Sequence, residues 1–378
     1  MSISPNKLKV MTVVGTRPEI IRLSRVISKL DASCEHCLVH TGQNFDYELN
    51  KLFFEQLKLP DPNYFLNSAG KTSTETTGEI IKKIDPILAH FMPDAFLVLG
   101  DTNSCLSAIA AKKRKIPVFH MEAGNRCFDL RVPEETNRKI VDHISDINLP
   151  YSKIAREHLI REGMKSDQII VTGSPMKEVL EFYKKEINDS KILEHLKLKK
   201  NKFFVVSCHR EENVDDARNI QNLGKTLNCL ADNYNIPIIV SLHPRTKLRI
   251  SKNKIKFHEK VNLMKPLGFL DYIKLQQNAY CVLSDSGTIS EEASILGFDA
   301  LNLREAHERP EAMEEAAVMM TGLDPQHIIR CLTILKDPAA NLNKINIPSD
   351  YNVMNVSDKV LKIILSYTNF IKRNNWGL

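Results

Sequence analysis

The sequence predicts an α/β protein with two doubly wound parallel-sheet domains that face one cleft. Short apolar runs of strand length alternate with amphipathic helical patterns along the chain. Buried strands separated by helices are typical of parallel sheets built from βαβ units. A first series of these alternating patterns ends near the middle of the chain, and a second series then begins. The 378 residues are enough to form two full-sized hydrophobic cores.

Each expected strand is an apolar run that a helix-like segment follows. In the first half the runs are LKVMTVVG (8–15), AFLVLGD (95–101), IPVFHME (116–122) and QIIVTGS (168–174). In the second half they are KFFVVSCHRE (202–211), IPIIVSLHP (236–244), AYCVLSDSG (279–287) and ALNLRE (300–305). We expect an N-terminal domain over 1–172, a hinge near Thr172–Val179 and a C-terminal domain over 173–355. A last helix over 356–378 is expected to pack back on the N-terminal domain.

The composition narrows the class of protein. The net charge is +6 with Lys and Arg scattered, whereas a nucleic-acid binder would gather them into a stripe with aromatic residues. Cys34 and Cys37 lie close together, but no second pair completes a zinc site. The start MSISPNKLKV lacks the apolar core of a signal peptide, and no apolar run reaches membrane-spanning length. We therefore expect a cytoplasmic protein without a nucleic-acid or membrane partner.

Ligands of doubly wound sheets bind at the carboxyl ends of the strands. The first such end is GTRPE (15–19), where Gly15 permits a tight turn and free N–H groups at a helix start attract anions. Arg17 and Arg22 are then suited to clamping a diphosphate. A plain turn with two solvated arginines fits this motif equally well. No G-x-G-x-x-G follows the strand, which disfavours a nicotinamide dehydrogenase.

Two further strand ends carry polar residues. GDTNS (100–104) places Asp101 after a strand, as a helix cap, a catalytic acid or a ligand-positioning group. Local sequence does not separate these roles. CHREEN (208–213) places His209 and Arg210 after a strand of the second half. A lone His is usually structural, but this pair at a strand end suits an anion.

The segment SDSGTISEE (284–292) is the best phosphate candidate. Ser286, Gly287 and Thr288 open a helix directly after a strand and offer N–H groups and hydroxyls. Glu292, farther into that helix, is placed to bind a ribose diol. The alternative is a serine-capped helix with an exposed Glu. In ERPE (308–311), Arg309 precedes a Pro at an expected helix start.

The stretch HMEAGNRCFDLRVPEETNRKIVDH (120–143) crowds opposite charges into one strand-loop-helix junction. Its charged residues include Glu122, Asp129, Glu134, Glu135, Arg126, Arg131 and Arg138. In the first helical turn, Glu134 is suited to act as a base, because the helix dipole lowers the pKa of a carboxylate there. Alternatively it is an ordinary acid paired with Arg138, worth only ~0.3–0.5 kcal/mol.

These motifs together resemble the non-hydrolysing UDP-N-acetylglucosamine 2-epimerase family. GTRPE, GDT, H-x-EAG…PEE-x-NR, HREE, SDSG-x-x-x-EE and ERPE occur in this order, over roughly residues 8–335. The resemblance implies a GT-B fold of two Rossmann-like domains with the active site between them. It also implies a homodimer, a UDP-activated N-acetylamino sugar as substrate and no metal or redox cofactor.

The resemblance also implies the site residues. The catalytic carboxylates would be Asp101, Glu122 and Glu134, with His209 as a further catalytic residue. The residues that bind the UDP-sugar would be Arg17, Arg22, Arg126, Arg210, Tyr272, Ser286, Gly287, Thr288, Glu292 and Arg309. Tyr272 lies in the segment where the family holds uracil, although a core role fits it equally well.

The family reaction explains the crowded junction. Removal of the weakly acidic C2 proton is coupled to loss of UDP from C1, and UDP then adds back while a proton reaches the opposite face of C2. Two faces need two acid–base groups, and cations must stabilise the departing diphosphate. Carboxylates and arginines therefore have to be neighbours.

Departures from the family pattern bear on the substrate. Arg22 stands where the best-known members have Lys, Cys208 and Thr288 replace glycines, and the loop NRCFDLRVP (125–133) is short. This loop resembles the branch that converts UDP-2-acetamido-2,6-dideoxy-β-L-talose to UDP-N-acetyl-L-fucosamine for capsule or O-antigen synthesis. The alternatives are a UDP-N-acetylglucosamine 2-epimerase giving UDP-N-acetylmannosamine, a GT-B glycosyltransferase and a catalytically silent nucleotide-sugar sensor.

Overall fold

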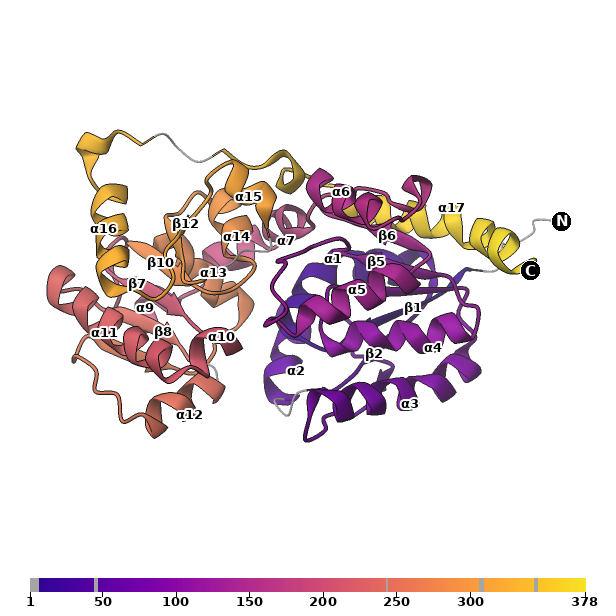
Figure 1. Cartoon of the computed structure of the whole chain (residues 1–378), viewed down its shortest axis with the longest axis horizontal. Coiled ribbons are helices and arrows are strands. Elements are labelled where there is room, and N and C mark those ends of the chain that lie inside the picture. The colour runs from indigo at the N-terminus through magenta and orange to yellow at the C-terminus, as the bar shows by residue number, and fades with distance from the viewer. Residues whose placement is uncertain (1–6, 44–46, 243, 306–308, 343–345) are drawn as a thin grey trace. The chain divides into compact units, whose positions relative to one another are not determined.

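A computed structural model describes the chain except for residues 1–6, 44–46, 243, 306–308 and 343–345. The chain forms two compact units (Figure 1). The first contains Met1–Phe182 and Ser349–Leu378, and the second contains Tyr183–Pro348. The chain therefore leaves the first unit once and returns to it near its end.

The first unit is built on a six-stranded parallel sheet. Its strands are β1 (Lys9–Val14), β2 (Glu35–His40), β3 (Tyr64–Phe65), β4 (Ala95–Leu99), β5 (Val118–Met121) and β6 (Ile147–Leu149). Their order is β3-β2-β1-β4-β5-β6. The central strands are apolar and buried, as expected where helices cover both faces of a parallel sheet.

Helices connect the strands of the first unit. They are α1 (Arg17–Ser33), α2 (Tyr47–Gln56), α3 (Ser73–Phe91), α4 (Ala108–Lys113), α5 (Glu134–Ile144), α6 (Lys153–Arg161), α7 (Met176–Phe182) and α17 (Val356–Trp376). Short 3-10 turns add η1 (Asn103–Ser107), η2 (Ser166–Gln168) and η4 (Ser349–Tyr351).

The second unit repeats this plan. Its strands are β7 (Phe204–Ser207), β8 (Ile238–Ser241), β9 (Val261–Met264), β10 (Cys281–Ser284), β11 (Ala300–Asn302) and β12 (Met319–Met320). Their order is β12-β11-β10-β7-β8-β9, again all parallel. The fold class predicted from sequence, two doubly wound parallel sheets, is confirmed.

The helices of the second unit are mostly short. They are α8 (Lys184–Asp189), α9 (Ile192–His195), α10 (Glu211–Val214), α11 (Ala217–Tyr234), α12 (Pro244–Lys252), α13 (Phe269–Asn278), α14 (Ile289–Leu296), α15 (Pro310–Glu314) and α16 (Pro325–Leu335), with the 3-10 turn η3 (Pro338–Ala340). Across the described parts of both units, no helix is long and apolar enough to cross a membrane.

Each sheet has one point where the strand order reverses. In the first unit this point lies between β1 and β4, and in the second it lies between β7 and β10. Ligands of such sheets bind outside the carboxyl ends of the strands at this point. Gly15, Asp101, His209 and Ser286 all follow these four strands.

The C-terminal helix α17 belongs to the first unit, beside α1. Lys29 of α1 pairs with Asp358 at 2.8 Å. Glu178 of α7 accepts the backbone N–H of Ser357 at 2.9 Å. Because α7 is tied to α17, the units divide at Phe182 and Tyr183, later in the chain than the boundary expected at 172.

One predicted strand is wrong. In QIIVTGS (168–174), Ile169 forms only an isolated bridge to Asn148, and the following residues run on as an extended segment. The backbone N–H groups of Ile170 and Thr172 bond to carbonyls of Asn148 and Pro150. The segment then turns at Gly173, whose φ is +83°. This early turn explains why the apolar run does not become a seventh strand.

The buried His40 at the end of β2 predicts a pH dependence of stability. Its Nδ1 accepts the N–H of Gly42 at 3.0 Å, its ring stacks on Phe65, and burial lowers the pKa of His40 to about 4. The unfolded chain then binds more protons between that value and about 6.5. The contribution of neutral His40 to the free energy of unfolding is therefore fully present above about pH 6.5. It decreases as the pH falls towards about 4, by about 3 kcal/mol in total.

Urea unfolding between pH 7 and pH 4.5 measures this loss. His40→Asn keeps an acceptor for Gly42 but does not titrate, so its free energy of unfolding should vary less with pH. The matched control is His90→Asn, because His90 is exposed. Equal pH dependence in the wild type and His40→Asn would contradict the prediction.

Candidate active site

The turn between β1 and α1 presents Arg17. The backbone N–H groups of Gly15 and Thr16 bond to Glu19 Oε2 at 2.5 and 2.8 Å, closing a capping box at the helix start. A Cβ atom at Gly15 would lie 2.3 Å from Thr41 Oγ1, so only glycine fits. Arg17 is half-buried in the first turn of α1, where helix N–H groups favour an anion.

Asp101 lies after β4, next to Gly100, which has a φ of +75°. Arg138 of α5 donates from Nε to Asp101 Oδ2 at 2.7 Å, and its Nη2 lies 2.6 Å from the same oxygen. The Asp101 side chain remains 21% exposed, whereas that of Arg138 is buried. The carboxylate is thus held from one side and open on another.

Arg138 also binds Glu135, at 2.9 Å. Burial raises the pKa of Glu135, but hydrogen bonds from Cys127 and the Arg138 charge outweigh it and hold the pKa low. Glu135 is therefore a buried ion-pair partner. Glu134, the first residue of α5, is only half-buried and stays the better candidate for proton transfer.

Glu122 follows β5 with a φ of +64°, a strained conformation for a non-glycine residue. Its carboxylate accepts hydrogen bonds from Arg22 Nη1 and, at 3.3 Å, from Asn125 Nδ2. A Cβ atom at Gly100 would lie 3.9 Å from Glu122 Oε2, so this carboxylate lies beside the turn that bears Asp101. Arg22, predicted to bind UDP, is a buried partner of a predicted catalytic residue.

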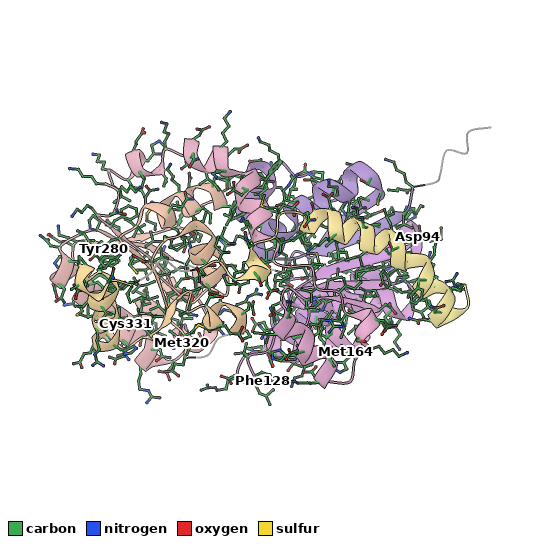
Figure 2. The ribbon with its side chains drawn as sticks, turned by 90° about the horizontal axis from the view of Figure 1, so that it is seen from above. Asp94, Phe128, Met164, Tyr280, Met320 and Cys331 are labelled. Atoms are coloured by element: carbon green, nitrogen blue, oxygen red, sulfur yellow. The ribbon has the colours of Figure 1, made fainter. Side chains whose placement is uncertain are left out.

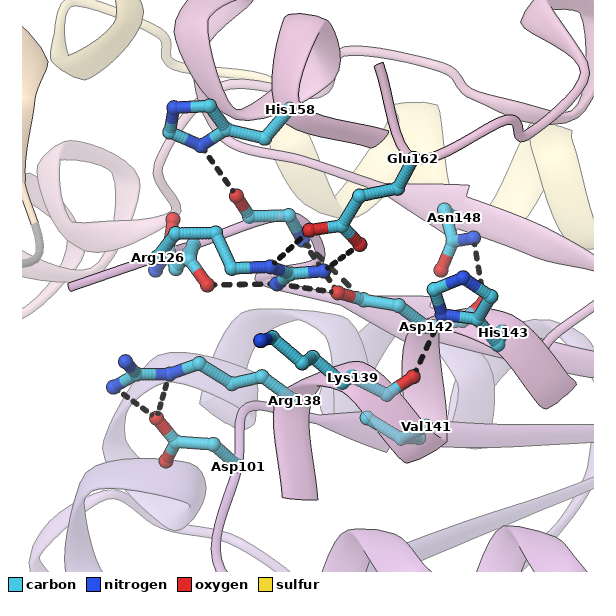
Figure 3. A network of polar contacts seen from close by, with 12 residues as sticks. Asp101, Arg126, Arg138, Lys139, Val141, Asp142, His143, Asn148, His158 and Glu162 are labelled. Atoms are coloured by element: carbon cyan, nitrogen blue, oxygen red, sulfur yellow. Dashed lines mark hydrogen bonds and ion pairs between the residues drawn. The ribbon is translucent and has the colours of Figure 1, made fainter. Parts of the chain in front are cut away.

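Arg126, predicted to bind the UDP-sugar, lies in a buried ion-pair network. Its side chain is fully buried, donating to both oxygens of Glu162 at 2.8 and 2.6 Å, with Nη1 2.8 Å from Asp142. Figure 3 shows this guanidinium facing both carboxylates, apart from the pair of Arg138 and Asp101. The local sequence could not reveal this, since Asp142 and Glu162 come from later elements.

The same network reaches the turn before Asp101. Asp142 faces Nδ1 of His120 at 2.9 Å, and Nε2 of His120 faces the carbonyl oxygen of Gly100 at 2.8 Å. Burial raises the pKa of Asp142, but His120 and Arg126 lower it by more than burial raises it. The pKa therefore lies below its ordinary value. Asp142 thus holds His120 of β5 against the turn at the end of β4.

The loop between Glu122 and Glu134 is exposed at its tip. Phe128 is 74% exposed, and Figure 2 shows its side chain at the surface. Its ring meets the ring of His158 edge-on, with 5.3 Å between the ring centroids. Asp129 and Arg131 pair with one another at 2.7 Å. The loop therefore carries an apolar side chain that is available for contact.

In the second unit, Asp285 organises the turn that bears His209 and Arg210. Asp285 is fully buried and accepts both backbone N–H groups at 2.9 Å, with Nδ1 of His209 3.2 Å away. Burial raises the pKa of Asp285, but the His209 charge, the N–H group of Arg210 and the side chain of Asn213 lower it more. The prediction did not include Asp285, although its place within SDSG after a strand was a usable signal.

The turn before α14 carries the phosphate candidates. Ser286 Oγ lies 3.0 Å from Thr288 Oγ1. Gly287 and Arg309 line one small recess with room for about one water molecule. The other residues of this recess are Ser290, Asn302, Arg304, Met313 and Val318. Glu308, of the motif that contains Arg309, lies outside the described residues.

Glu292 and Tyr272 lie close to this turn. Glu292 is 7% exposed and accepts Gln276 Nε2 at 2.8 Å. Burial and the nearby Glu292 charge raise the pKa of Tyr272, whose hydroxyl bonds to Ser207. The alternative interpretation of residues 284–292 was a serine-capped helix with an exposed Glu. Because Glu292 is buried, it does not fit that alternative.

The family model described as UDP-N-acetylglucosamine 2-epimerase matches residues 28–365. The chain belongs to this family. A UDP-N-acetylglucosamine 2-epimerase structure from Rickettsia bellii has 47% identity and a TM-score of 0.91, covering 98% of this chain and 100% of that chain. The structure of the Methanocaldococcus jannaschii enzyme in complex with UDP-GlcNAc and UDP has 33% identity and a TM-score of 0.88, covering 95% and 100%.

One relative of this chain is named for a different sugar. UDP-2,3-diacetamido-2,3-dideoxy-D-glucuronate 2-epimerase from Pseudomonas aeruginosa is 34% identical over 83% of this chain and 88% of its own. The predicted family, GT-B fold and isomerase class are therefore confirmed.

The buried network of Arg126 predicts an unequal pair of stability changes. Arg126→Met leaves Asp142 buried without its guanidinium, which should lower the free energy of unfolding by about 3–5 kcal/mol. Arg131→Met, in the same loop, breaks an Arg–Asp pair whose Arg side chain is 79% exposed, and should cost less than about 1 kcal/mol. Urea unfolding of both variants checks this, and equal losses would contradict it.

Proposed function

We propose that this epimerase inverts C2 of a UDP-activated 2-acetamido sugar by eliminating and re-adding UDP. The observation that carries the proposal is a pair of carboxylates, Asp101 and Glu122, each beside a buried guanidinium at the ends of β4 and β5. A base takes the C2 proton, the C–H electron pair becomes the C1–C2 double bond, and the C1–O bond breaks with its electrons leaving on UDP. Re-addition reverses these steps with protonation on the other face.

In this proposal the carboxylates transfer the protons. The guanidiniums of Arg138 and Arg22 pair with Asp101 and Glu122 and hold their carboxylates in place. The half-buried Glu134 at the start of α5 is the third acid–base group, and we do not divide the two faces of C2 among the three. Two groups are needed because one carboxylate cannot serve both faces.

The remaining predicted residues are proposed to bind the nucleotide. Arg17 and the turn of Ser286, Gly287 and Thr288 suit the phosphates, because each lies at a helix start. Glu292 suits the ribose, with Tyr272 beside it. His209, Arg210 and Arg309 supply further donors to the diphosphate, and we retain His209 as a candidate catalytic residue. Arg22 is proposed to hold the carboxylate of Glu122 in addition to binding UDP. We assign Arg126 no contact with the substrate.

We propose UDP-2-acetamido-2,6-dideoxy-β-L-talose as the substrate and UDP-N-acetyl-L-fucosamine as the product. The support is the resemblance of the loop 125–133, together with the exposed Phe128, which offers apolar contact to a C6 methyl. The second candidate substrate is UDP-N-acetylglucosamine, which the names of the R. bellii and M. jannaschii relatives favour. The homodimer, the cytoplasmic location and the capsule or O-antigen pathway stay predictions.

Amide replacements test the catalytic carboxylates. Asp101→Asn, Glu122→Gln and Glu134→Gln should each lower kcat by about 10²–10⁴, while UDP affinity measured by calorimetry changes far less. Asp85→Asn is a matched control, because Asp85 makes a similar two-point pair with Arg114 on the surface. Turnover in D₂O should place one deuterium at C2 of the product, and a product without it would rule out this route.

A comparison of substrates tests the specificity. The value of kcat/KM for the 6-deoxy-L-talo compound should exceed that for UDP-N-acetylglucosamine, because a C6 hydroxyl buried without a partner is penalised strongly. Phe128→Ala should lower the first value about tenfold or more if the ring contacts the methyl, worth about 1–3 kcal/mol. Efficient turnover of UDP-N-acetylglucosamine with none of the 6-deoxy sugar would refute the assignment.

A further inference from the structure

Glu19 is a buried carboxylate that the proposed reaction does not use. It lies in the first turn of α1 and is 2% exposed. Its Oε2 accepts the backbone N–H groups of Gly15 at 2.5 Å and Thr16 at 2.8 Å. Its Oε1 accepts hydrogen bonds from Thr102 Oγ1 at 2.7 Å and from Ser104 Oγ. Four donors thus converge on one side chain.

The two oxygens of Glu19 bind two different turns. Oε2 holds the turn directly before Arg17, at the end of β1. Oε1 holds the turn directly after Asp101, at the end of β4. Because β1 and β4 are the neighbouring strands at the reversal point of the sheet, Glu19 joins the two turns that border it.

Asp101 is consequently fixed on both sides. The residue before it, Gly100, has its carbonyl oxygen 2.8 Å from His120 Nε2. The residue after it, Thr102, donates to Glu19. Only the Asp101 side chain is left to be positioned, by Arg138.

Helix capping alone does not explain a buried carboxylate. Glu75 of α3 stands in the same T-x-x-E pattern after Thr72 and accepts the N–H of Lys71 at 2.8 Å, yet it is exposed. Burial raises the pKa of Glu19, so its ionised form is less stable there than in water. An exposed Glu would cap α1 without this cost.

We propose that Glu19 is a positioning residue that fixes the turn of Arg17 relative to the turn of Asp101. The functional meaning of this coupling rests on the proposed function, in which Arg17 binds the diphosphate and Asp101 transfers a proton. Glu19 exchanges no proton with the substrate. It sets the distance between the group that holds UDP and a group that acts on C2.

Substitutions can separate the two links. Glu19→Ala removes both. Thr102→Val combined with Ser104→Ala removes only the link to Oε1. Glu19→Gln preserves the shape, since its amide oxygen can accept both N–H groups and its NH₂ can donate to the two hydroxyls. Glu75→Ala, in the exposed copy of the pattern, is the matched control.

The readouts are UDP affinity by calorimetry, kcat per folded enzyme and urea unfolding. Glu19→Ala should weaken UDP binding and lower kcat about tenfold to a hundredfold, the scale of a displaced catalytic group. The Thr102/Ser104 double variant should lower kcat similarly, with UDP affinity within about twofold of the wild type. Glu19→Gln should restore most activity, and Glu75→Ala should change neither UDP affinity nor kcat.

Either of two results would overturn the positioning role. One is Glu19→Ala enzyme that binds UDP like the wild type. The other is a double variant that loses stability but keeps kcat, which would make Glu19 a helix cap only. If the wild type epimerised no UDP-sugar, the proposed function would fail separately. The effect of Glu19→Ala on UDP affinity would still decide the positioning role.

Discussion

The first unit depends on a set of buried or half-buried carboxylates that lie against guanidiniums. Three arginines form these ion pairs. Arg138 pairs with Asp101 and Glu135, and Arg22 pairs with Glu122. Arg126 pairs with Asp142 and Glu162. A buried charge without such a partner costs several kcal/mol. This pairing explains why residues 120–143 crowd opposite charges together, because each carboxylate that the fold buries there needs a positive partner beside it.

Buried hydrogen bonds and close packing also fix the backbone at the strand ends. Gly100, Glu122 and Gly124 all have positive φ values of +75°, +64° and +78°. At Gly124 a Cβ atom would lie 2.3 Å from the carbonyl oxygen of Ala155, so no larger residue fits. Asp142 of α5 holds this turn by accepting the N–H of Gly124 at 3.2 Å. The strain at Glu122 therefore persists inside a framework that buried hydrogen bonds fix.

The sequence was informative wherever chemistry follows an apolar run. The rule that ligands bind at the carboxyl ends of the strands placed Asp101, Glu122 and Ser286 directly after strands, where the structure has them. It could not identify partners, because these come from afar: Arg22 and Glu122 are 100 residues apart, and Glu19 and Ser104 are 85 apart. The buried pairing of Arg126 could not be predicted for this reason, since an arginine in a loop has the same local pattern whether it faces substrate or Asp142.

The claim that UDP leaves and returns is tested most directly by isotope exchange. The oxygen joining C1 to the β-phosphorus of the UDP-sugar is labelled with a heavy isotope, and phosphorus NMR follows the label during turnover. If the C1–O bond breaks, rotation of the bound β-phosphate moves label into non-bridging positions of the recovered UDP-sugar. The account predicts this scrambling in the wild type. Complete epimerisation with all label still in the bridge would contradict it.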